Sequence, residues 1–349
     1  MKRILFVSLF LSGFFISYLI GQVEISSDPN PTLFQFLYEQ DGHVPVMKIE
    51  TSVKELFRNK SVTEEYYIPG TMSLSQPEGE DLNFKAEFKV RGNTRKKVCS
   101  NAPIKLDLDS EELVALGLNK DVDKLKLVIQ CENGSRNYQQ LLKELLIYDL
   151  YEAIDTNGMQ VKLIKLEMYE NGEKKKDLNA FIVEDEETYA HRKQAKVLEK
   201  GKMNYAALNR LDYFKLCFFQ YMIANCDWSI KNKHNIELVK LPGVKKITSV
   251  PYDFDYCGLV DNNYAVPPEQ FDITEVTQRY FMVQTELSKD EFNEVVDFYE
   301  GKKDEFMAII ANHEYLEDKT KKSVTSFIEG FYKTMKNRGR MAKIARPKG

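Results

Sequence analysis

The spacing of apolar residues changes once along this chain, and that change constrains the fold more than any other feature. Up to about residue 186, several short segments alternate apolar and polar residues, which is typical of half-buried strands. After about residue 204, longer segments carry apolar residues at helical spacing. We therefore predict an α+β chain in which a sheet-rich lobe is followed by a mainly helical lobe.

Period-two alternation predicts three strands before the first long helix. Phe84, Ala86, Phe88 and Val90 fall on one face of the first segment, and charged residues fall on the other. The segments are LNFKAEFKVRG at 82–92, PIKLDLD at 103–109 and KLKLVIQ at 124–130. Each is expected to bury one face and expose the other.

One large helix and a hairpin complete the predicted sheet-rich lobe. Residues 137–154 lack glycine and proline and are rich in leucine, which favours a helix. Two further strands are expected at 161–169 and 178–185, separated by a segment that contains Asn171-Gly172. That dipeptide is a strong hairpin signal.

The second half of the chain opens with a helix that is apolar on nearly every side, over 204–225, and is therefore expected to be buried. Two short strands follow, at 235–239 and 247–253, around a Leu-Pro-Gly turn. From residue 288 the pattern is helical, and Ser288 with Glu291 forms a capping-box signature at its start.

Length and charge narrow the class of protein. A chain of 349 residues can form one large domain or two lobes that share a core. The 49 basic and 53 acidic residues are nearly balanced, which argues against a dedicated nucleic-acid binder.

The N-terminus has the form of a secretory signal peptide over residues 1–21. Lys2 and Arg3 precede an apolar stretch from Ile4 to Ile20, which the small residue Gly21 follows, and a loose leader is expected over 22–43. We expect export to the periplasm or the exterior, with no stable membrane insertion after cleavage. A retained anchor is the alternative, because such a stretch is near the lower length limit for a membrane span.

The five cysteines include no C-x-x-C pair, which argues against a zinc site. Cys226 and Cys257 flank the acidic motifs described next, so a bridge between them is one interpretation. We favour the other interpretation, in which all five are small buried hydrophobic residues.

A concentration of polar residues lies in NCDWSIKNKHNIELVKLPGVKKITSVPYDFDYCG, residues 225–258. Asp227 follows the buried helix, Asn235 begins a strand, and Asp253 and Asp255 follow the next strand. An antiparallel hairpin would bring Asn235 and the acidic pair to one end. Metal-dependent phosphoryl transfer uses such oxygen ligands. Each residue alone is more common as a turn or loop residue.

This stretch resembles the CotH kinase family, the atypical protein kinases of spore coats and their bacterial relatives. The match lies in Asn-x-Asp, in His-Asn before a strand, and in Pro-aromatic-Asp-x-Asp with a glycine shortly after. Upstream, VRGNTRKKVCSNAPIKLDLD at 90–109 resembles the Arg-Gly-Asn segment and the Pro-x-Lys strand of the family. The resemblance covers roughly residues 44–260.

The resemblance implies a two-lobed, atypical protein-kinase-like fold. The nucleotide-binding lobe would span 44–186, and the helical lobe, with the catalytic loop and the acidic motif, would span 187–349. ATP with Mg²⁺ or Mn²⁺ would be the donor, and a serine or threonine hydroxyl on a protein would be the acceptor.

The resemblance also implies roles for individual residues. Asp227 would orient or deprotonate the acceptor hydroxyl, and Lys105 would pair with the phosphates, held by Glu144. The implied metal ligands are Asn235, Asp253 and Asp255, and the implied nucleotide contacts are Lys105, Arg91 of the Arg-Gly-Asn segment, and Val183 and Asp185 of a hinge at the adenine.

Four alternatives remain open from the sequence. Asn232 competes with Asn235 as the metal ligand, because it stands five residues after Asp227. Lys126 competes with Lys105, because its strand immediately precedes the large helix. The chain could be a non-catalytic surface or assembly module. It could also be a metal-dependent hydrolase, although only His234 lies close to the acidic cluster.

Overall fold

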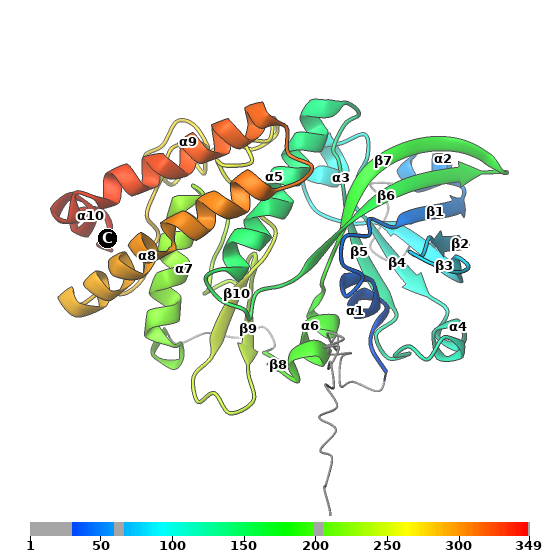
Figure 1. The fold of residues 1–349 in the computed structure, drawn as a ribbon, viewed down its shortest axis with the longest axis horizontal. Coiled ribbons are helices and arrows are strands. Elements are labelled where there is room, and N and C mark those ends of the chain that lie inside the picture. The colour runs from blue at the N-terminus through cyan, green and yellow to red at the C-terminus, as the bar shows by residue number, and fades with distance from the viewer. Residues whose placement is uncertain (1–29, 59–65, 199–204, 348–349) are drawn as a thin grey trace, which may run out of the picture.

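The computed structural model describes residues 30–58, 66–198 and 205–347, so the expected signal peptide lies outside the described residues. The fold is mixed α+β, with strands gathered in the N-terminal part and helices in the C-terminal part, as predicted (Figure 1). The expected lobe boundary at 186/187 falls at the start of helix α6 (Glu186–Lys193).

Seven strands close into a barrel in the order β1-β2-β3-β4-β5-β7-β6. The strands are β1 (Val46–Thr51), β2 (Ile68–Leu74), β3 (Leu82–Val90), β4 (Ile104–Leu108), β5 (Lys124–Ile129), β6 (Val161–Glu170) and β7 (Glu173–Val183). Neighbours pair antiparallel except β1 with β6, which pair in parallel and complete the closure. Sequence reasoning predicted a sheet, not a barrel.

The alternation seen in the sequence fills the barrel interior. Phe84, Ala86 and Phe88 of β3 point inward and are buried, as are the corresponding apolar residues of the other strands. We call this cluster the barrel core. The β6–β7 hairpin turns at Asn171 and Gly172, whose φ angles of 55° and 75° are left-handed, as the Asn-Gly signal predicted.

Short helices surround the barrel. They are α1 (Leu33–Tyr38), α2 (Val53–Arg58), α3 (Arg95–Val98) and α4 (Ser110–Ala115). The segment 22–43, expected to be a loose leader, includes the helix α1 at Leu33–Tyr38. A capping box between Thr32 and Gln35 starts α1, and Leu33, Phe34 and Leu37 are buried, which anchors this segment to the barrel.

Helix α5 (Ser135–Glu152) lies between the barrel and the helical part (Figure 1). Its buried residues belong to a second cluster, which also includes the outward-facing Val128, Phe181 and Val183 of the barrel. We call this cluster the shared core. The two parts of the molecule therefore meet across α5.

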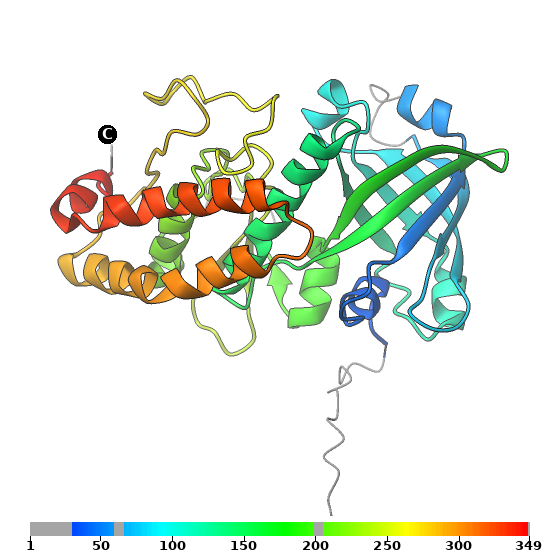
Figure 2. The ribbon, with the colours of Figure 1, turned by 45° about the horizontal axis from the view of Figure 1, so that its top comes forward.

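The helical part contains α7 (Arg210–Met222), α8 (Lys289–Asn312), α9 (Asp318–Met335) and α10 (Arg338–Ile344). The predicted capping box forms between Ser288 and Glu291. Helices α8 and α9 lie side by side, beside the long irregular segment that precedes α8 (Figure 2). A small sheet, ordered β10-β9-β8, is built from β8 (Lys196–Val197), β9 (Ile236–Lys240) and β10 (Thr248–Pro251).

A disulfide joins Cys99 to Cys131. The expectation that all five cysteines are small buried hydrophobic residues is therefore wrong for these two. Cys217 and Cys257 are free and buried, so the bridge between Cys226 and Cys257 does not form either. Across the described residues, we find no helix with the length and apolar character that a membrane span needs.

Candidate functional site

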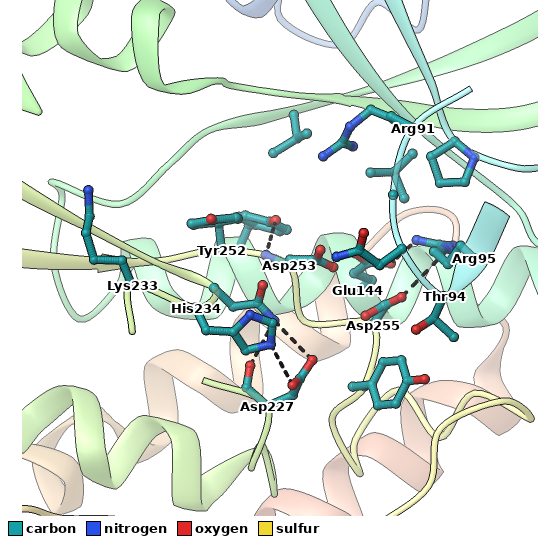
Figure 3. A pocket seen from close by; sticks show the side chains of 18 residues that line it. Arg91, Thr94, Arg95, Glu144, Asp227, Lys233, His234, Tyr252, Asp253 and Asp255 are labelled. Carbon is teal, nitrogen blue, oxygen red and sulfur yellow. Dashed lines mark hydrogen bonds and ion pairs between the residues drawn. The ribbon is translucent and has the colours of Figure 1, made fainter. Parts of the chain in front are cut away.

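A cavity of about 310 Å³ lies where the barrel, α5 and the β9–β10 hairpin meet (Figure 3). Seven of the nine predicted site residues line it, and they come from both parts of the molecule: Arg91, Glu144, Val183, Asp227, Asn235, Asp253 and Asp255. Lys105 and Asp185 are absent from the lining formed by the described residues. Asp185 instead caps α6, where its carboxylate accepts a hydrogen bond from the Thr188 amide.

Asp227 is held by a loop that closes on itself after α7. Its amide donates to Asn225 Oδ1 at 2.9 Å. The Nδ2 group of Asn235 donates to the Asp227 carbonyl at 2.8 Å and to its carboxylate at 3.1 Å. His234 Nε2 contacts the other carboxylate oxygen at 2.8 Å. Asp227 is thus fixed at the cavity edge while 36% of its side chain stays exposed.

As a candidate metal ligand, Asn235 has a more suitable geometry than Asn232. Asn235 lines the cavity and is only 8% exposed. Because its Nδ2 is taken up by Asp227, its Oδ1 remains as the side-chain acceptor for a cation. Asn232 is exposed, and its amide donates to Ser229 Oγ at 3.2 Å.

The antiparallel hairpin brings Asn235 and the acidic segment together, as predicted. Ile236 pairs with Pro251, and the Tyr252 amide donates to the Asn235 carbonyl at 3.1 Å. Asp253 has a left-handed φ of 58°, and its amide donates to Tyr148 Oη of α5 at 3.0 Å. Helix α5 therefore helps to fix the backbone of the acidic segment.

Phe254 anchors the triplet Asp-Phe-Asp in the shared core. Its ring is fully buried, with centroids 4.9 Å from Tyr148 and 6.0 Å from Phe219. Because the central residue points into the core, both flanking aspartates line the cavity (Figure 3). Asp255 is only 6% exposed.

The expected pairing of Lys105 with Glu144 is not formed between the described residues, and Glu144 pairs with Arg95 instead. The Arg95 Nη1 to Glu144 Oε2 distance is 3.2 Å, and the Arg95 Nε to Asp255 Oδ2 distance is 3.8 Å. Arg95 lies on α3, in the loop between β3 and β4, and is buried. Arg95, a loop residue, is therefore the ion-pair partner of Glu144, where the resemblance implied Lys105 of a strand.

Lys105 has the outward direction that its strand predicts, but it does not line the cavity as the outward-facing Val128 and Val183 do. Ile104, Leu106 and Leu108 fill the barrel core, so Lys105 faces outward from β4, beside Lys126 in register. Lys126 in turn pairs with Glu186 of α6. Burial, followed by the repulsion of Lys126, lowers the pKa of Lys105.

Negative charge is in excess around Arg95. Burial raises the pKa of Asp255 well above its ordinary range, Asp253 raises it further, and Arg95 opposes both. Tyr264 Oη donates to Asp255 Oδ2 at 2.9 Å. Burial also raises the pKa of Glu144, again against the effect of Arg95.

The residues present fit a hard divalent cation. Glu144 Oε1 is buried and has no hydrogen-bond partner among the described residues. The side-chain atoms of Asn235, Asp253 and Asp255 that could bind a cation are all oxygens, the ligand atoms that Mg²⁺ and Mn²⁺ prefer. No group of three or more His, Cys, Asp or Glu at metal-binding spacing occurs in the described part of the chain. Mg²⁺ sites that share substrate phosphates need only one or two carboxylates.

His234 was noted in the sequence only as a weak candidate. The hydrogen bond to Asp227 is the main reason that the pKa of His234 is raised above 6.5, and burial opposes it. The ring therefore occupies one oxygen of the Asp227 carboxylate.

A second cavity, of about 280 Å³, shares Asp227 and Tyr256 with the first. Its remaining lining is mostly apolar and comes from the end of α7 and the segment before α8: Ala224, Cys226, Val266, Pro267, Pro268, Glu269, Ile273 and Val276. Asp227 therefore stands between a charged cavity and an apolar one.

Comparisons with known proteins add little to this geometry. No family model matches the chain, and no curated protein matches it. Among solved structures, the crystal structure of the Helicobacter pylori proinflammatory kinase CtkA is similar at 12% identity and a TM-score of 0.41. The match covers 74% of this chain and 94% of that one.

Proposed function

We propose that the protein is a metal-dependent atypical kinase of the CotH type that transfers a phosphoryl group from a nucleotide to a protein hydroxyl. One observation carries the proposal: Asp227, Asn235, Asp253, Asp255 and Arg95 converge on a single cavity between the barrel and the helical part. Phosphoryl transfer depends mainly on positioning and charge, and these residues provide both.

Each residue has a role that follows from its contacts. Asn235 Oδ1, Asp253 and Asp255 would hold Mg²⁺ or Mn²⁺, which supplies charge neutralisation at the phosphates when bound. Asp227 accepts the hydrogen bond of the acceptor hydroxyl and orients its oxygen. Arg95 and Arg91, both in the loop after β3, face the same space and bind the phosphate oxygens.

The apolar part of the cavity lining suits the nucleotide base, and the second cavity suits the acceptor segment. Val128, Val183 and Tyr252 offer an apolar surface for the base, so we keep Val183 as a nucleotide contact and assign ATP as the donor. The acceptor segment, with its serine or threonine, approaches Asp227 from the second, apolar cavity, because the donor phosphates fill the first.

Export remains part of the proposal. The Cys99–Cys131 disulfide supports it, since disulfides persist in oxidising compartments and are rare in the cytosol. We therefore propose that the protein acts in the periplasm or outside the cell, on exported protein substrates.

Binding is the first test. We expect ATP with Mn²⁺ to raise the unfolding midpoint of the wild type by several degrees, because ligands that bind only the folded state stabilise it. Asp255→Ala should remove this shift, whereas Asp121→Ala, an exposed aspartate of the barrel, should retain it. A wild type that no nucleotide stabilises with any divalent metal rules the proposal out.

Transfer is the second test, and it separates a kinase from a non-catalytic module with the same fold. The position of Lys105 outside the cavity lining favours that second candidate. A kinase incorporates labelled phosphate from γ-labelled ATP into a protein acceptor, and Asp227→Ala abolishes incorporation. A non-catalytic module binds its partner equally well with aspartate or alanine at position 227, and it incorporates no label.

A further inference from the structure

In the loop that carries Arg95, the buried apolar residues begin only at Cys99 and are Cys99, Ala102 and Pro103. Within α3 the only buried residue is Arg95 itself. Val98 is 49% exposed, and Gly92, with a φ of 87°, makes a left-handed turn that only glycine adopts at low cost. Hydrophobic burial, the usual source of loop order, therefore acts at Cys99 and beyond, and does little for the part of the loop before Cys99 that carries Arg95.

The guanidinium makes two hydrogen bonds to described residues. Arg95 Nη2 donates to the Ile129 carbonyl at 3.2 Å, and Nη1 donates to Glu144 at 3.2 Å. Its Nε is buried without a hydrogen-bond partner among the described residues, since Asp255 lies 3.8 Å away. An arginine held in this way depends on its backbone for position.

The backbone is tied down by the disulfide. Cys99 follows Arg95 by one helical turn and is the C-cap of α3. Its partner, Cys131, lies between the end of β5 and the start of α5, the helix that carries Glu144. Beside the bridge, the Asn101 amide donates to the Cys131 carbonyl at 3.0 Å and the Ser100 amide donates to Glu132 at 2.8 Å.

We infer that the Cys99–Cys131 disulfide is a positioning element for Arg95, so that the cavity binds phosphate groups tightly only while the bridge is formed. The inference rests on the proposed function for the identity of the ligand. A dithiol that reduces the bridge supplies two electrons and two protons, which yields two cysteine thiols and the oxidised, cyclic dithiol. The loop is then joined to the segment before α5 by hydrogen bonds, and to α5 itself by the Arg95–Glu144 ion pair.

Titration calorimetry with ATP and Mn²⁺, and with inorganic tripolyphosphate and Mn²⁺, tests the inference on the full chain. Replacing both cysteines, Cys99→Ser with Cys131→Ser, should weaken both ligands about tenfold or more, the scale of one charge-assisted hydrogen bond. Leu113→Ala is the matched control: it destabilises the barrel core far from the cavity and should leave both affinities unchanged.

A double-mutant cycle shows whether the bridge acts through Arg95. Arg95→Met in the bridged protein should lose a similar factor in affinity. In the Arg95→Met background, removal of the bridge should cost little more, because the group that it positions is already absent. Full additivity of the two losses contradicts the inference.

A readout without ligand completes the test. Trypsin cleaves after the basic residues of this loop only when the backbone opens, so we expect faster cleavage at Arg95–Lys97 in the double cysteine variant than in Leu113→Ala. If the wild type binds neither ligand, the proposed function fails together with the inference. If the wild type binds both and the double cysteine variant binds them equally well, only the inference is overturned.

Discussion

At the scale of single residues, the buried acidic groups favour ligand binding at the expense of stability. The folded state raises the pKa of Asp255, mainly through burial and then through Asp253. Between the unfolded pKa of about 3.9 and the raised folded value, the folded state binds more protons, so stability falls as pH rises through that window. A bound cation would offset this cost at neutral pH.

We therefore expect Asp255→Asn to stabilise the metal-free protein at pH 7, by roughly 0.5–2 kcal/mol, the usual range when strain at a functional site is relieved. The same change should remove the stabilisation by ATP with Mn²⁺. Differential scanning calorimetry in the presence of a chelator measures the first effect. A metal-free Asp255→Asn protein that melts below the wild type contradicts this account of the site.

His234 gives a second pH dependence of the same sign. Its pKa is raised by the hydrogen bond to Asp227, so its contribution to stability is complete below pH 6.5 and is lost as pH rises through the folded pKa. Because the protonated ring occupies Asp227, transfer should fall as pH drops through the same value. An NMR titration of the ring locates that pKa, and His234→Gln should remove the acidic limb of the rate profile.

At the scale of elements, one close contact fixes the acidic segment against the turn that follows α7 and against the segment before α8. A Cβ added to Gly258 would lie 2.3 Å from the Val276 carbonyl oxygen and 2.9 Å from Ala224 Cβ. The Gly258 amide also donates to the Ala224 carbonyl at 3.0 Å. The glycine that follows the Asp-Phe-Asp triplet is therefore required by close approach and not by an unusual φ angle.

The same substitution at two glycines tests this contact. Gly258→Ala should destabilise the protein by about 1–3 kcal/mol, as overpacking does in well-packed sites, and weaken ATP binding. Gly301→Ala in α8 meets no atom within 4 Å and should stabilise the helix by up to about 1 kcal/mol. Urea unfolding of both variants compares them directly, and equal effects would argue against a special role for Gly258.

Local patterns in the sequence predict individual strands and hairpins, but not the pairing of strands that lie far apart in the chain. Alternation identified β3, β4 and β5, and the antiparallel rule placed Asn235 beside Asp253, because both depend on local pattern. Closure of the barrel depends on the parallel pairing of β1 with β6, segments far apart in sequence that no local pattern specifies. The role of Arg95 was missed because three successive basic residues, 95–97, look alike until the fold buries only the first.

At the scale of the whole molecule, α5 makes the two parts interdependent. Its buried face belongs to the shared core, together with Val128 and Phe181 on the outside of the barrel. Phe181 also packs edge-on against Tyr148 of α5, with centroids 6.1 Å apart. We infer that the barrel and the helical part unfold together and not as separate domains.

The single tryptophan makes this coupling measurable. Trp228 is buried in the helical part, next to Asp227, so its fluorescence reports on that part alone. Leu106→Ala opens a space inside the barrel core and should destabilise the protein by about 2–5 kcal/mol. With coupled parts, the Trp228 transition in urea shifts with this distant change and coincides with the far-ultraviolet circular dichroism transition. A Trp228 transition that stays at its wild-type midpoint would establish instead that the helical part unfolds independently of the barrel.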